Sequence, residues 1–136
     1  GVAVRVLIQR AAHMAHTPPR HHAYLYIALG FSGPGGLDVL GSCAMVDDSP
    51  PNDWTHHNTR WIHCISSGEG PDYELAVTRA YAKVAFDMHD RLMPEWLGMK
   101  ILTFSAVCGR EGEREAARKA LDWYRETPRL RSSNER

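Results

Sequence analysis

A regular spacing of apolar residues between positions 77 and 92 constrains the fold more than any other feature of this sequence. The apolar side chains recur at helical intervals: Val77, Tyr81, Val84, Ala85, Met88 and Leu92. This spacing places them on one face of an α-helix. Pro71 suits a first-turn position, and Asp72 and Glu74 suit the positive end of the helix dipole. Pro94 marks the end, so the segment predicts an amphipathic helix that packs its apolar face on another layer.

Segments typical of short strands precede this helix. They cover Ala23–Phe31, Leu37–Val46 and Thr59–Ser66, and they are separated by a Gly/Pro turn and a polar loop. Short connections favour antiparallel neighbours. Beyond the helix, we expect a fourth strand over Lys100–Val107 and a second helix over Glu111–Glu126.

The order of these elements, β-β-β-α-β-α, predicts an α+β domain with a mixed, mainly antiparallel sheet covered by two helices. The length of 136 residues corresponds to one domain, which we place over residues 15–128. Residues 1–14 alternate in polarity. They are interpreted either as an extra N-terminal strand or as vector-derived or upstream sequence. Residues 129–136 are expected to form a flexible polar tail.

Charge and cysteine content narrow the classes of function. Sixteen basic residues balance sixteen acidic ones, which argues against an overall electrostatic grip on nucleic acid, although a local patch would survive it. No apolar run approaches the ~20 residues of a membrane span. Three cysteines cannot all pair with one another. A reducing compartment is therefore favoured, and we expect a soluble cytoplasmic protein.

Candidate ligand-binding residues come from loops rich in aromatic and imidazole groups. Trp54 and Trp96 lie in or near predicted loops, and His56 and His57 are adjacent in one of them. These side chains would line a ligand pocket or a partner interface; the alternative for the tryptophans is to close the ends of the core. The eight histidines show no spacing typical of a zinc site, so we expect no metal site and no cofactor.

The turn Ser32-Gly33-Pro34-Gly35-Gly36, followed by Leu37–Leu40, and the order of elements resemble the ribonuclease H-like fold over about residues 23–126. Glu74 lies early in the first helix, where that family keeps a catalytic glutamate. The resemblance implies carboxylates that hold two magnesium ions. The segments 23–31 and 103–107 contain no aspartate, so we expect this nuclease activity to be absent.

No complete catalytic set accompanies the fold pattern. Our main hypothesis is therefore a non-catalytic binding or interaction protein that forms a homodimer through a sheet edge or an aromatic patch. A small ligand would fit this hypothesis, whereas nucleic acid is not favoured and a membrane is not expected. A second hypothesis is that the chain is a small hydrolase-type enzyme with a His/carboxylate cleft. Glu74 and His63 are then the candidate catalytic residues. A third is a nucleic-acid-associated ribonuclease H-like module without nuclease activity.

Overall fold

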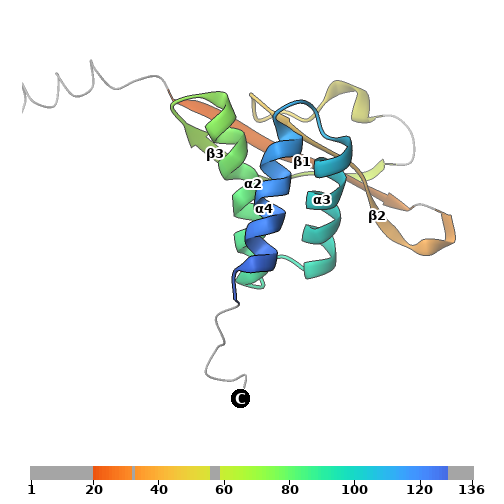
Figure 1. Cartoon of the computed structure of the whole chain (residues 1–136). Helices are drawn as coiled ribbons and strands as arrows, with labels where there is room; N and C mark the ends of the chain where they lie inside the picture. The colour runs from red at the N-terminus through yellow and green to blue at the C-terminus, as the bar shows by residue number, and fades with distance from the viewer. Residues whose placement is uncertain (1–19, 32, 56–58, 129–136) are drawn as a thin grey trace, which may run out of the picture.

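Across the residues that the structure describes, three strands are followed by three α-helices (Figure 1). The computed structural model describes residues 20–31, 33–55 and 59–128. The predicted N-terminal extension, the polar tail, His56 and His57 lie outside the described residues. The strands are β1 (His21–Phe31), β2 (Leu37–Met45) and β3 (Thr59–Gly70), and the helices are α2 (Tyr73–His89), α3 (Glu95–Cys108) and α4 (Glu113–Glu126). Two short 3-10 helices, η1 (Gly33–Gly35) and η2 (Asn52–Thr55), lie in the loops. The predicted α+β class is thus confirmed.

The sheet is antiparallel, and β1 lies in its centre in the order β2-β1-β3. Leu25 of β1 is opposite Ala44 of β2 on one side and Ser66 of β3 on the other. Alternate residues of β1 point toward the helices and are buried in the core, namely Ala23, Leu25, Ile27 and Leu29. One face of the sheet therefore supplies the apolar surface on which the helices pack.

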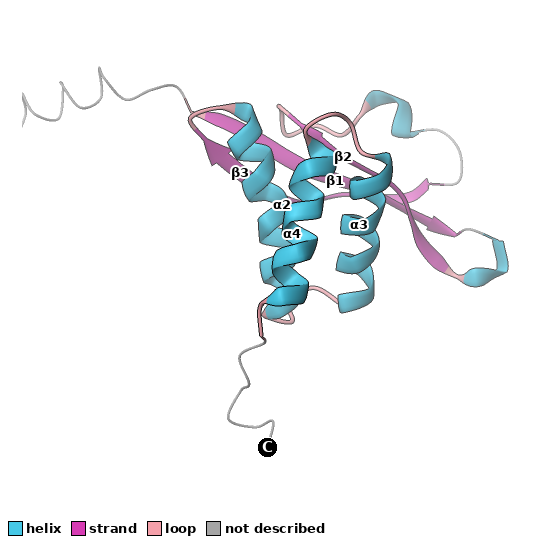
Figure 2. Ribbon diagram, viewed as in Figure 1, coloured by secondary structure: helices cyan, strands magenta, loops and turns pink. Residues whose placement is uncertain are grey.

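The helices α2, α3 and α4 lie on the same side of the sheet (Figure 2). α2 contacts β1 and β3, α3 contacts β2, and α4 packs against both α2 and α3. The predicted helical face is confirmed from Val77 to Met88, because its apolar side chains are buried, but it was wrong for Leu92, which lies beyond the end of α2 and is exposed. α2 begins at Asp72, whose carboxylate accepts a hydrogen bond of 2.8 Å from the backbone N–H of Leu75.

The strand predicted over residues 100–107 was wrong, because this segment belongs to α3. Its buried residues Gly98, Ile101, Leu102 and Ser105 follow helical spacing. A short apolar run does not distinguish a buried strand from a buried helix by periodicity alone. Pro94, interpreted only as the end of the preceding helix, is the N-cap of α3. In the described residues, three helices rather than two therefore cover the sheet. The ladders in the described residues are all antiparallel rather than mixed, and the fourth strand implied by the ribonuclease H-like resemblance is helical in this chain.

The loop after β2 covers part of the opposite face of the sheet. Tyr26 alternates with the core residues of β1, and its hydroxyl donates a hydrogen bond to the Asp48 carboxylate. Trp54 of η2 lies against Gly41, where an added Cβ would be 3.1 Å from the indole ring. Gly41 therefore allows the indole to approach the β2 backbone closely.

Candidate functional site

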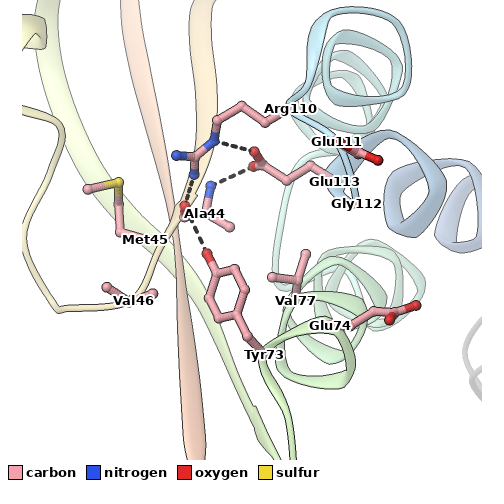
Figure 3. Close-up of a pocket in the computed structure, with 10 residues that line it drawn as sticks. All are labelled: Ala44, Met45, Val46, Tyr73, Glu74, Val77, Arg110, Glu111, Gly112 and Glu113. Carbon is pink, nitrogen blue, oxygen red and sulfur yellow. Dashed lines mark hydrogen bonds and ion pairs between the residues drawn. The ribbon is translucent and has the colours of Figure 1, made fainter.

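A cleft of about 710 Å³ opens where the end of β2, the first turns of α2 and the loop between α3 and α4 meet (Figure 3). This volume lies within the range of about 300–1,000 Å³ that is typical of small-ligand sites. Residues from three separate parts of the chain line it: Ala44, Met45, Val46, Tyr73, Glu74, Val77, Arg110, Glu111, Gly112 and Glu113. The cleft is thus a product of the tertiary fold rather than of one local motif.

Glu113, the first residue of α4, forms the back wall of the cleft and is only 3% exposed. Its Oε1 accepts hydrogen bonds from the backbone N–H of Ala44 at 2.6 Å and from the Tyr81 hydroxyl at 2.9 Å. Its Oε2 accepts one from Nε of Arg110 at 2.7 Å. One carboxylate therefore joins β2, α2 and the start of α4.

The backbone of Ala44 is bound by side chains on the side that faces away from β1. Its N–H donates to Glu113, and its carbonyl accepts from the Arg110 guanidinium and from the Tyr73 hydroxyl, the latter at 3.2 Å. A carboxylate and a guanidinium take the places of the acceptor and donor that a neighbouring strand would offer. The β2 edge is therefore closed at this point.

The protonation states of this wall follow from its surroundings. Burial, and then the charge of Glu113, raises the pKa of Tyr81 well above its ordinary value, although Ser105 and Ser42 oppose the shift. Burial also raises the pKa of Tyr73. Burial alone would lower the pKa of Arg110, but its hydrogen bond to Glu113 and the Glu113 charge outweigh this, so the pKa is raised. At neutral pH both phenols are therefore neutral and the guanidinium is charged.

The open part of the cleft combines an apolar floor with acidic groups. Val77, Met45 and Val46 supply aliphatic surface. Glu74 and Glu111 are exposed carboxylates, and in Figure 3 both point away from the Arg110–Glu113 pair. Three carboxylates and one guanidinium line the cleft, so it carries an excess of two negative charges.

Of the predicted site residues that the structure describes, only Glu74 lines this cleft. His63 lies on β3, and the structure does not bring it to the cleft beside Glu74. Trp54 packs on Gly41, and Trp96 is 46% exposed in the first turn of α3, so neither tryptophan contributes to the cleft. A catalytic role for Glu74 with His63 stays a prediction.

Sequence reasoning missed Glu113, Arg110, Tyr73 and Ala44. The acidic first turn of α4 was visible, but it is typical of any helix start. Glu113 and Ala44 are 69 positions apart, and no local pattern connects them. Within the described residues, no three His, Cys, Asp or Glu side chains come together as a metal ion would require.

No family model, no curated protein and no solved structure matches this chain. Across the part of the chain that the structure describes, no helix combines the length and apolar character needed to cross a bilayer.

Proposed function

We propose that this chain is a non-catalytic binding module whose cleft between β2, α2 and α4 takes a molecule with an apolar body and a positively charged amine. One observation carries the proposal. The polar groups of the back wall are bound to one another, while two exposed carboxylates stand beside an apolar floor. The wall holds the shape of the cleft, and the floor and the carboxylates are left to meet a ligand.

The back wall is poorly suited to catalysis. General acid–base chemistry needs a group within hydrogen-bond reach of the reacting proton and a pKa near the working pH. Both Glu113 oxygens already accept hydrogen bonds from Ala44, Tyr81 and Arg110. The raised pKa values of Tyr73 and Tyr81 keep both phenols neutral near pH 7. A structural role for these groups accounts for every contact that they make in the wall.

Charge selects the class of ligand. A unit charge about 4 Å from an opposite charge gains about 1 kcal/mol in water, which corresponds to roughly fivefold in affinity. Near Glu74 and Glu111, an ammonium group gains this free energy of binding, and a carboxylate loses the same amount. The aliphatic floor adds about 25 cal/mol for each Å² of apolar ligand surface that it buries. An amine attached to an apolar group uses both contributions.

A matched set of three probes tests the proposal. Phenethylamine, phenethyl alcohol and phenylpropionate share an aromatic ring on a short chain and differ in charge. Isothermal titration of the full chain should rank phenethylamine first, roughly fivefold or more ahead of the alcohol, and phenylpropionate last. Added salt should reduce the difference, because the two carboxylates are exposed.

Two variants locate the effect. The double change Glu74→Gln and Glu111→Gln should remove the preference for the amine and leave the weak apolar binding. Glu115→Gln changes an exposed carboxylate of α4 outside the cleft and should leave the ranking unchanged. The proposal fails if the three probes bind equally, if none binds, or if the double variant keeps the full preference.

A further inference from the structure

The two edges of the sheet are protected very differently. On β2, the outward-facing backbone of Ala44 is bound by Glu113, Arg110 and Tyr73. Near the other end of β2, Asp38 forms an ion pair of 2.7 Å with Lys100 of α3. Side chains of α2, α4 and the loop before α4 therefore bind the edge backbone at Ala44, and α3 packs along β2, so a further strand would have to displace them.

The β3 edge has backbone groups without a partner in the described part of the chain. Among the described residues, β3 forms a ladder with β1 alone. Backbone groups in an antiparallel pair alternate between facing the partner and facing away. Ala44 faces away from β1, so Leu25 opposite it faces β3. The same alternation repeats at every second residue of the β1–β3 register. The peptide N–H and C=O groups of Ile62 and Cys64 therefore point away from β1, toward the outside of the sheet.

The open part of the edge is confined to the first half of β3. The register is irregular between Cys64 and Ser66, which interrupts pairing there. Further on, the Glu69 carbonyl accepts a 2.7 Å hydrogen bond from Arg79, and its carboxylate pairs with Arg20 at 2.9 Å. With respect to the described residues, Trp61–Cys64 is therefore the part of the edge that is open to a further strand.

This open segment lacks the usual protection of an edge strand. Natural edge strands carry charges or proline, or are short. β3 is 12 residues long, and Trp61–Gly68 contains no Lys, Arg, Asp, Glu or Pro. Trp61 of this segment is 45% exposed and Phe31 of β1 is 49% exposed, and their ring centroids are 6.2 Å apart. Unused peptide groups and exposed apolar surface thus coincide at this end of the sheet.

We infer that β3 pairs antiparallel with β3 of a second copy of this chain, across a twofold axis near His63, to form one continuous sheet. A twofold interface brings the same surface of both copies together. The segment Trp61–Cys64 has no carboxylate, ammonium or guanidinium group, so it meets itself without repulsion between like charges. The cleft lies at the β2 edge and is not part of this interface, so the pairing does not depend on ligand binding.

Sedimentation velocity of the full chain over a dilution series tests the pairing, with a reductant present because Cys64 is an exposed thiol. The wild-type protein should sediment as a reversible dimer. Cys64→Pro removes an outward N–H that β1 does not use, and it should weaken the dimer by more than about tenfold with an unchanged far-UV circular dichroism spectrum. The matched control Cys64→Ser keeps this N–H and should remain dimeric.

A second variant decides the question even if Cys64→Pro fails to fold. His63→Lys leaves the backbone intact and places like charges on both sides of the axis, so it should also weaken the dimer by more than about tenfold. His63→Gln, which adds no charge, should not. The inference is overturned if the wild-type chain is monomeric at every concentration, or if His63→Lys remains as dimeric as His63→Gln.

Discussion

Replacing Glu113 by alanine should be among the most destabilising single changes in this chain. The substitution removes the acceptor for two buried donors, the backbone N–H of Ala44 and the hydroxyl of Tyr81. Both residues are fully buried behind the Glu113 side chain, and water replaces the lost carboxylate only where the cleft reaches the space that it vacates. Arg110 also loses its partner, but its side chain is 60% exposed and is rehydrated.

The magnitude follows from these contacts. A buried donor left without a partner costs roughly 1–3 kcal/mol, so the two donors together cost roughly 2–6 kcal/mol. The exposed Arg110 contributes at most about 1 kcal/mol more. A domain of this kind has about 5–15 kcal/mol of stability in total. Glu113→Ala should therefore remove a large fraction of it.

Glu113→Gln separates hydrogen bonding from charge. Both buried donors bind the same oxygen, Oε1, whereas Arg110 binds Oε2. A glutamine carbonyl at the Oε1 position has two lone pairs and keeps both bonds. The pair with Arg110 is lost, and the amide NH2 at the buried Oε2 position faces the Nε–H of Arg110, donor against donor. Glu113→Gln should therefore cost roughly 1–3 kcal/mol, less than Glu113→Ala, which leaves both buried donors without an acceptor.

Equilibrium unfolding in urea, followed by far-UV circular dichroism, measures these differences. Glu115→Ala is the matched control, because Glu115 lies in the same first turn of α4 but is exposed. Its loss should cost less than about 1 kcal/mol. The reasoning is refuted if Glu113→Ala is no more destabilising than Glu115→Ala, or if Glu113→Gln costs as much as Glu113→Ala.

Two further predictions follow from the packing of α2. A Cβ on Gly68 would lie 2.3 Å from the backbone oxygen of Ala76, so Gly68→Ala should destabilise the fold by roughly 1–3 kcal/mol. A Cβ on Gly35 would meet nothing within 4 Å, so Gly35→Ala should be nearly neutral in the same urea assay. Burial and the Glu113 charge raise the pKa of Tyr81 above the ordinary 10.0, so the unfolded state loses this phenol proton more readily. Stability should therefore fall as the pH rises above about 10, and urea unfolding of Tyr81→Phe should show a smaller fall; an equal fall in both proteins would contradict the role of Tyr81.

Local pattern was enough for the long helix and for the strands. The spacing from Val77 to Met88 extends over several turns, and only a helix uses it consistently. The segment 100–107 is shorter and apolar, and what makes it helical is contact with β2 and α4, beginning at Pro94. Sequence periodicity contains no information about those contacts.

The candidate site was less accessible to sequence reasoning than the fold. Glu74 was identified because its place at a helix start is a local property. The pairing of Glu113 with Ala44 depends on how α4 returns to the end of β2, which is settled only in the folded chain. The side-chain chemistry of His63 and Trp96 favours a functional role, but the fold places neither of them in the cleft.

Nuclear magnetic resonance mapping of phenethylamine on the nitrogen-labelled chain tests the central claim most directly. Saturable shifts should concentrate on the backbone amides of Ala44, Glu74, Val77 and Gly112, which line the cleft, and phenylpropionate should leave these amides nearly unmoved. Shifts that cluster away from the cleft, or equal shifts with both probes, would contradict the proposed acidic binding site.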